Sequence, residues 1–171
     1  MKYFMLNSFV EINHEKFEKL IEKSFGKKLV ENYYTYVQPS YIYIAKNNED
    51  YAGAIVVEKF LPGLFYLDKI AVTPDYRGNG VGKSLWSIIE ANSEKLVWRS
   101  KPDNPINSFY LKECSGNEKF EGWNVFWKSM SDIEIHIAID YALGKKLTLE
   151  APNEKKLIPS IENHSMLLNL P

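Results

Sequence analysis

The spacing of apolar residues predicts a helix near the start of the chain and then a series of strands. Phe17, Leu20 and Ile21 share one face of a helix over residues 14–24, and Gly26 suits its C-terminal end. Runs rich in β-branched and aromatic residues follow. They predict strands over 41–45, 51–57 and 64–72, with a hairpin turn at Asn47-Asn48 and a break at Pro62-Gly63.

Helical spacing returns after residue 80 and is followed by further strands. Val81, Leu85 and Ile89 recur on one face and predict a helix over 80–93. We expect strands over 95–100 and 123–128, a helix over 104–112, and a turn or short strand over 116–122. The central feature of the chain is thus a strand, a Gly-rich turn and a helix.

The pattern after Ser131 is compatible with two structures. Isoleucines stand at every second position from Ile133 to Ile139, as in a strand. However, Ser131 with Glu134 forms a capping box, and Gly144 suits a C-terminal cap. We therefore expect a helix here.

Length and composition fit one α+β domain over residues 1–144, followed by a C-terminal tail over 145–171 that contains three prolines. The chain is 45% hydrophobic and 25% charged, which is ordinary for a globular protein. Its 21 Lys and Arg residues nearly balance 22 Asp and Glu residues. This argues against a broad nucleic-acid surface, because phosphate binding draws on clustered basic charge. We interpret the lysine pairs at 27–28, 145–146 and 155–156 as solvated surface.

Residue types that bind metals or form disulfides are sparse. Cys114 is the only cysteine, which excludes an internal disulfide, and we interpret it as a packed thiol. His14, His136 and His164 lack the spacing of metal ligands, so we expect no metal. The start of the chain lacks the features of a signal peptide or presequence, and no apolar run has the length of a membrane span. We expect a soluble, cytoplasmic protein, or one of the mitochondrial matrix if the source is eukaryotic.

The Gly-rich turn reads Arg77-Gly78-Asn79-Gly80-Val81-Gly82-Lys83 and follows the strand that ends at Val72. Glycines let backbone N–H groups crowd around an anion, and a helix N-terminus adds partial positive charge. A pyrophosphate is the natural ligand, with Arg77 and Lys83 supplementing the charge. The turn is not a Walker loop, since Gly78 is one residue too close to Lys83, and the acidic residue of a dinucleotide fingerprint is missing. A glycine-rich turn without a ligand is the alternative.

Arg77-x-x-Gly80-x-Gly82, after the strand Asp68-Lys69-Ile70-Ala71-Val72, resembles the acetyl-CoA motif (Q/R)xxGx(G/A) of the GNAT acetyltransferases. The resemblance implies the acyl-CoA N-acyltransferase fold, a mixed, mostly antiparallel sheet with splayed central strands flanked by helices. It also implies a bulge in the strand before the turn. The free backbone groups of Ile70, Ala71 and Val72 are then expected to bind the pantetheine arm, and the turn from Arg77 to Lys83 the pyrophosphate.

A narrower resemblance extends from Tyr66 to Lys128, with a looser fit over residues 24–29. This stretch is similar to the acetyltransferase domain of N-acetylglutamate synthase and of the related synthase-kinases. The matching elements are Tyr66-Leu67-Asp68-Lys69, Leu85-Trp86, Trp98-Arg99-Ser100, Asn104-Pro105-Ile106-Asn107 with Tyr110, and Gly122-Trp123 through Phe126-Trp127. The resemblance implies acetyl transfer to the α-amino group of glutamate.

Basic side chains in this stretch suit a dicarboxylate. Arg99 and Lys101 are two apart in a strand and point the same way, about 7 Å from one another. Lys69, on a strand expected nearby, adds a third cation. Spaced cations hold both carboxylates of glutamate and leave its amine free. By resemblance, Lys69 and Arg99 bind the carboxylates, with Lys101 and Asn104 beside them; three exposed charges are the alternative.

By the same resemblance, Tyr110 lies near the sulfur of the cofactor and donates a proton to the departing thiolate as general acid. Asn107, one helical turn earlier, is expected to face the cofactor. Outside this motif we would interpret a helical tyrosine as core. No Cys–His or Ser–His pair indicates an acyl-enzyme, so we expect direct attack of the neutral amine on the thioester. The sequence shows no clear general base, and we expect a water chain in that role.

Three functions remain open on this basis. The first is a glutamate N-acetyltransferase that supplies arginine biosynthesis. The second is acetylation of another amino acid or a small amine, because the family commonly has Arg where this chain has Lys101. The third is a non-catalytic acetyl-CoA-binding regulatory module. Expected partners, besides the small-molecule acceptor, are a second copy of the chain through the apolar helix over 132–143, or an amino-acid kinase domain such as relatives carry; no nucleic acid or membrane is expected.

Overall fold

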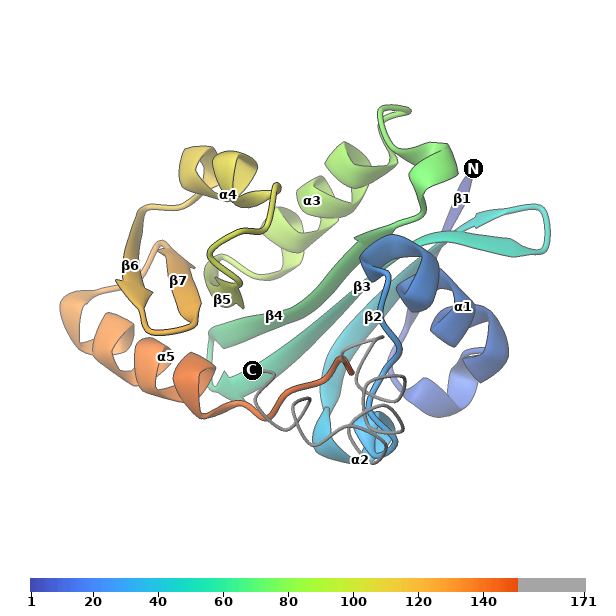
Figure 1. Ribbon diagram of the computed structural model, residues 1–171. Helices are drawn as coiled ribbons and strands as arrows, with labels where there is room; N and C mark the ends of the chain where they lie inside the picture. Colours follow the sequence, from blue (N-terminus) through green and yellow to red (C-terminus); the bar gives the residue numbers. More distant parts are fainter. Residues whose placement is uncertain (151–171) are drawn as a thin grey trace, which may run out of the picture.

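The computed structural model describes residues 1–150, which form one mixed sheet of seven strands with helices on both faces (Figure 1). The strand order is β1-β2-β3-β4-β5-β7-β6, and every neighbouring pair is antiparallel except β4 and β5. The strands are β1 (Lys2–Leu6), β2 (Pro39–Asn47), β3 (Asp50–Leu61), β4 (Leu64–Val72), β5 (Lys95–Ser100), β6 (Gly116–Phe120) and β7 (Trp123–Lys128). The helices are α1 (His14–Phe25), α2 (Tyr33–Tyr36), α3 (Val81–Asn92), α4 (Asn107–Glu113) and α5 (Asp132–Gly144), with 3-10 turns at Phe9–Glu11 and Pro74–Tyr76. Within this part of the chain, no helix combines the length and apolar character needed to cross a membrane.

Capping residues fix the ends of two helices where the sequence predicted them. The side chain of Asn13 accepts a hydrogen bond from Lys16 N at the start of α1, and Gly26 ends that helix with a φ of 67°. Ser131 and Glu134 form both bonds of a capping box at the start of α5. This confirms a helix, rather than a strand, after Ser131.

Helix α4 begins at Asn107, three residues later than predicted. The side chain of Asn104 accepts a hydrogen bond from Ile106 N at 3.2 Å, and Asn104 O accepts one from Asn107 N at 3.0 Å. Asparagine offers the backbone this local turn as a competitor to the helix. The predicted first turn of the helix is therefore a loop.

Apolar clusters cover both faces of the sheet. On one side, called the α3 face here, α3 and α4 cover a cluster in which Trp86, Trp98, Tyr110 and Phe126 pack together. On the other side, called the α1/α5 face, α1 covers strands β2 to β4, and α5 covers β5 and β7. Because burying a large apolar side chain contributes about 1.5–3 kcal/mol, the aromatic cluster firmly anchors α4 on the sheet.

Strands β4 and β5 pair over only part of their length. They run parallel and pair where Leu64–Tyr66 meets Lys95–Val97. Beyond that point β4 continues along β3, whereas β5 continues along β7. The two strands therefore separate in the middle of the sheet, as the resemblance implied; we call this region the β4–β5 divergence.

Strand β4 also carries the expected bulge. Lys69 pairs with Val56 of β3, but Leu67 pairs with the adjacent Val57. Asp68 is therefore an extra residue on β4 that opposes no residue of its own. The bulge lies where the β4–β5 divergence begins.

The sequence did not predict the edge strand β1. Its apolar residues Phe4 and Met5 are 41% and 53% exposed, so they do not follow the alternation of a half-buried strand. The strand exists because it pairs with β2, where Lys2 lies opposite Lys46 and Leu6 opposite Ile42.

The chain after α5 also departs from the prediction. Gly144 is the last helical residue, and Lys145 continues in extended conformation, so the expected left-handed cap at Gly144 is wrong. Residues 145–150, expected to begin an appended tail, run from α5 back over the domain and pair with residues 28–30 (Figure 1). The rest of the predicted tail, 151–171, lies outside the described residues.

The cap of α5 makes stability dependent on acid pH. Hydrogen bonds from Lys95 and from the Ser131 amide lower the pKa of Glu134 from 4.5 to about 2. A carboxyl group with a lowered folded pKa stabilises the fold above pH 4.5, and this contribution is lost as pH falls toward the folded pKa. We expect Glu134→Gln to remove that part of the acid sensitivity, measured as the change in Tm between about pH 6 and about pH 3. An equal loss of Tm in both proteins would contradict this.

Candidate functional site

The edge of β4 that faces the divergence presents main-chain groups. Thr73 N donates to Ala52 O of the β3 side at 3.0 Å, and main-chain direction alternates along an antiparallel pair. Ile70 and Val72 therefore direct their N–H and C=O groups away from β3, toward the divergence. The structure differs from the expectation for Ala71, whose main-chain groups point to β3.

The Gly-rich turn leaves the start of α3 without a side-chain cap. Gly78 and Gly80 have φ values of 83° and 85°, which glycine adopts without strain. No side chain of the described residues caps the helix at Gly80, so the first N–H groups of α3 are available to a ligand. A Cβ atom built on Gly82 would meet Val72 at 3.9 Å, an ordinary contact. Val81 is buried and offers only its main chain. This helix end suits an anion.

Basic residues flank the turn in two different ways. Arg77 donates from Nε to Val72 O at 3.1 Å and from Nη2 to Ser24 O at 2.6 Å. It thus ties the turn to β4 and to the end of α1. Lys83 and Asn79 are exposed, and Lys83 is the cation that is free to approach an anion from solvent.

Lys69 lies on the α1/α5 face and is only 5% exposed. Its ammonium donates to Asp68 Oδ2 at 3.2 Å, to Asp68 O at 3.4 Å and to Thr148 Oγ1, and lies 5.3 Å from the centroid of the Tyr33 ring. An ammonium has three protons, so each has a partner. Burial lowers the pKa of Lys69 below its usual value, and the charge of Asp68 opposes this shift.

Arg99 lies on the same face, beside α5. It donates from Nη1 to Ala142 O and from Nη2 to Lys146 O, both at 3.0 Å, and its guanidinium lies 3.9 Å from the centroid of a Trp123 ring. The charge of Arg99 also contributes to the lowered pKa of Lys69. The structure therefore brings together the two residues that the resemblance assigned to substrate carboxylates.

Lys101 and Asn104 lie farther along the chain from β5. Lys101 is exposed, and its ammonium lies 4.1 Å from the centroid of the Trp123 ring. Trp123 thus contacts both Arg99 and Lys101. Asn104 is engaged in the turn before α4, where it accepts from Ile106 N.

Tyr110 lies on the α3 face, 7% exposed, among aromatic rings. Its hydroxyl makes no hydrogen bond within residues 1–150. Burial raises the pKa of Tyr110 above its usual value, so the phenol is protonated at neutral pH. Asn107, at the start of the same helix, donates to Lys101 O at 2.8 Å, and its buried Oδ1 has no partner among the described residues. Such an oxygen favours a ligand that brings a donor.

Sequence reasoning missed a buried ion pair beside Lys69. Lys145 was interpreted as solvated, but its ammonium donates to Glu58 Oε1 at 2.5 Å, and the two side chains are 12% and 5% exposed. The ammonium also lies 5.4 Å from the centroids of the Tyr66 and Tyr141 rings. The one local signal was a charged residue in the otherwise apolar run Ile55-Val56-Val57-Glu58.

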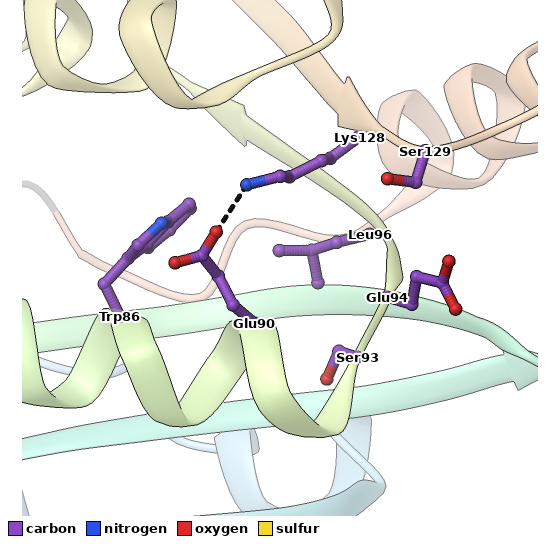
Figure 2. Close-up of a pocket in the computed structure, with 7 residues that line it drawn as sticks. All are labelled: Trp86, Glu90, Ser93, Glu94, Leu96, Lys128 and Ser129. Atoms are coloured by element: carbon purple, nitrogen blue, oxygen red, sulfur yellow. Dashed lines mark hydrogen bonds and ion pairs between the residues drawn. The ribbon is translucent and has the colours of Figure 1, made fainter.

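A separate hollow of about 100 Å³ lies at the other end of α3 (Figure 2). An ion pair of 2.5 Å between Lys128 and Glu90 crosses it. The hollow is lined by Trp86, Glu90, Ser93, Glu94, Leu96, Lys128 and Ser129. It contains none of the predicted site residues and adjoins the part of β5 that still pairs with β4. The candidate site is therefore the β4–β5 divergence.

This architecture matches a solved structure, the PaiA N-acetyltransferase of Thermoplasma acidophilum in complex with coenzyme A. The TM-score is 0.58 at 15% identity, and the match covers 76% of this chain and 100% of that one. The divergent strands and the glycine turn are thus those of the GNAT acetyltransferase fold, as expected. The family is narrower than the fold: a family model described as NAT, the N-acetyltransferase of N-acetylglutamate synthase, matches residues 4–139. The chain belongs to this family.

Two relatives show the extent of the similarity. An acetylglutamate kinase of Xanthomonas campestris is 35% identical over 130 residues, covering 74% of this chain and 30% of the relative. The mitochondrial N-acetylglutamate synthase of Mus musculus is 35% identical over 128 residues, covering 73% of this chain and 24% of the relative. The chain thus spans less than a third of the length of either relative.

Proposed function

We propose that this protein transfers the acetyl group of acetyl-CoA to the α-amino group of L-glutamate, and so supplies arginine biosynthesis. The observation that carries the proposal is the arrangement of the β4–β5 divergence. Tyr110 and the open end of α3 lie on one face of the sheet, and Lys69 and Arg99 lie on the other. Membership of the family supports acetyl transfer, and two neighbouring cations support an acceptor with two carboxylates.

In this proposal acetyl-CoA lies along the open edge of β4. The main-chain groups of Ile70 and Val72 bind the pantetheine arm, and the N–H groups of residues 78–83 bind the pyrophosphate. Lys83 adds charge, and Arg77 holds the turn in place. The unpaired Oδ1 of Asn107 accepts a hydrogen bond from an amide of the pantetheine.

The reaction is a direct displacement. The neutral amine of glutamate attacks the thioester carbon, a C–N bond forms, and the C–S bond breaks. Tyr110 gives its proton to the departing sulfur and regains one from solvent, while the amine loses its proton to water. The N–H of Ile70 donates to the carbonyl oxygen, where negative charge develops. Fixing the carboxylates on Lys69 and Arg99 positions the amine for attack.

The test is acetyl-CoA-dependent release of free thiol with a panel of amino acids and small amines. Glutamate is expected to give the highest kcat/KM. Binding of acetyl-CoA without turnover of any amine would refute the proposal and favour a regulatory module.

A second candidate is acetylation of another amino acid or small amine. It is favoured by Lys101, an exposed point charge where the family commonly has the two-pronged donor of Arg. The same panel decides between the two, because a better acceptor than glutamate would replace it in the proposal.

Tyr110→Phe tests the general acid. The variant is expected to lower kcat by about 10²–10⁴-fold and to leave KM for glutamate unchanged. The fold should be retained, because the hydroxyl makes no hydrogen bond within residues 1–150. Steady-state kinetics and Tm measure the two effects, and a nearly unchanged kcat would remove Tyr110 from the mechanism.

A further inference from the structure

Residues 145–150, here called the strap, cross the α1/α5 face after α5 (Figure 1). They pair with residues 28–30 in a short antiparallel ladder. The contacts are Val30 N to Thr148 O at 3.0 Å, Glu150 N to Lys28 O at 2.7 Å, and a bridge between Leu29 and Leu149. The strap is therefore an ordered element that joins two distant parts of the chain.

The strap contacts both cations of the acceptor site. Thr148 Oγ1 accepts a hydrogen bond from Lys69, and Lys146 O accepts one from Arg99 at 3.0 Å. Ala142 O, from the last turn of α5, accepts a further bond from Arg99 at 3.0 Å. Each cation thus holds oxygen atoms of the protein where the proposed function requires oxygen atoms of a carboxylate.

Lys69 cannot bind an acceptor while Thr148 keeps its place. All three protons of the ammonium have partners, and the side chain is 5% exposed. A carboxylate reaches it by replacing the hydroxyl of Thr148. The exchange is favourable, because a hydrogen bond between two charged groups is stronger than one between an ammonium and a neutral hydroxyl.

The surroundings of the strap give it room to shift. A hollow of about 270 Å³ lies along its flank. The hollow is lined by Tyr36, Val37, Tyr141, Gly144, Lys145, Lys146 and Thr148. The ion pair between Lys145 and Glu58 fixes the end of the strap near α5, so the part that carries Thr148 is the part that moves.

We propose that the strap occupies the acceptor site in the absence of acceptor, and that a carboxylate of the acceptor displaces Thr148 from Lys69. This inference rests on the proposed function. Thr148 then determines specificity, since only a group that binds an ammonium more strongly than a hydroxyl does reaches Lys69. An anionic side chain meets this requirement, and a neutral one does not.

Thr148→Val removes the competing hydroxyl and keeps the shape of the side chain. Since a hydrogen bond to a charged group is lost from the acceptor-free state, KM for glutamate is expected to fall about tenfold, with KM for acetyl-CoA unchanged. Thr148→Ser keeps the hydroxyl and should keep the wild-type KM. A KM for glutamate that stays the same or rises in Thr148→Val overturns the inference. Absence of glutamate turnover in the wild-type protein would instead refute the proposed function.

Hydrogen exchange tests the same inference on the wild-type chain without any variant. The amides of Val30 and Glu150 take part in the ladder between the strap and residues 28–30. Saturating glutamate is expected to speed their exchange, while amides in the centre of β3 serve as an unchanged reference. Exchange that slows or stays constant at both amides overturns the inference.

Discussion

Replacing Arg99 with alanine is expected to lower kcat/KM for glutamate by about 10²–10³-fold, mainly through KM, and to leave the affinity for acetyl-CoA unchanged. The side chain is held in place by the carbonyls of Ala142 and Lys146 and by the ring of Trp123. Its loss removes a pre-oriented guanidinium on which a carboxylate forms two parallel hydrogen bonds. Kinetics with glutamate, and titration of acetyl-CoA by calorimetry, measure the two effects separately.

Lys101→Ala is the matched control for Arg99→Ala. Lys101 contacts the same Trp123 ring but is exposed to solvent, so its loss is expected to change kcat/KM by less than about tenfold. Arg99→Lys keeps the charge but loses the two-pronged geometry, and should fall between the wild type and Arg99→Ala. A wild-type KM for glutamate in Arg99→Ala would remove the carboxylate role of Arg99.

Replacing Gly82 with valine is expected to weaken acetyl-CoA binding by about 100-fold, because a branched side chain at the start of α3 blocks the approach of phosphates to its N–H groups. The fold itself tolerates the change. A Cβ atom at Gly82 would meet only Val72, at 3.9 Å, and valine is a somewhat better helix former than glycine. Calorimetric titration of acetyl-CoA measures the affinity, and Tm measures the fold.

Gly82→Ala provides the control for this prediction. The motif that the turn resembles accepts Gly or Ala at this position, so the alanine variant should bind acetyl-CoA nearly as the wild type does. Unchanged affinity in Gly82→Val would show that the pyrophosphate does not bind at the start of α3.

Local sequence signals predicted most of the fold. The periodicities of α1, α3 and β2 to β5 are each carried within one short segment, and the capping box at Ser131 decided between a helix and a strand. The Gly-rich turn was equally local, because its conformation depends on its own glycines.

The parts that the sequence did not predict depend on distant contacts. Lys145 is buried because Glu58, 87 residues earlier, lies opposite it. Thr148 reaches Lys69 across 79 residues. A polar segment after the last helix gives no local sign that it will fold back over the sheet, so the strap was interpreted as a tail. The resemblance identified Lys69 and Arg99 but gave no information on what binds them when acceptor is absent.

The extra residue in β4 has a consequence for how the two substrates approach one another. Side chains of a regular strand alternate between its faces, yet Asp68 and Lys69 both contact Tyr33 on the α1/α5 face. Without Asp68 as a bulge, the parity of the strand would reverse, and Lys69 would share a side with Ile70's present neighbours around α3. One inserted position therefore lets the amino acid and the thioester reach the same strand from opposite sides of the sheet.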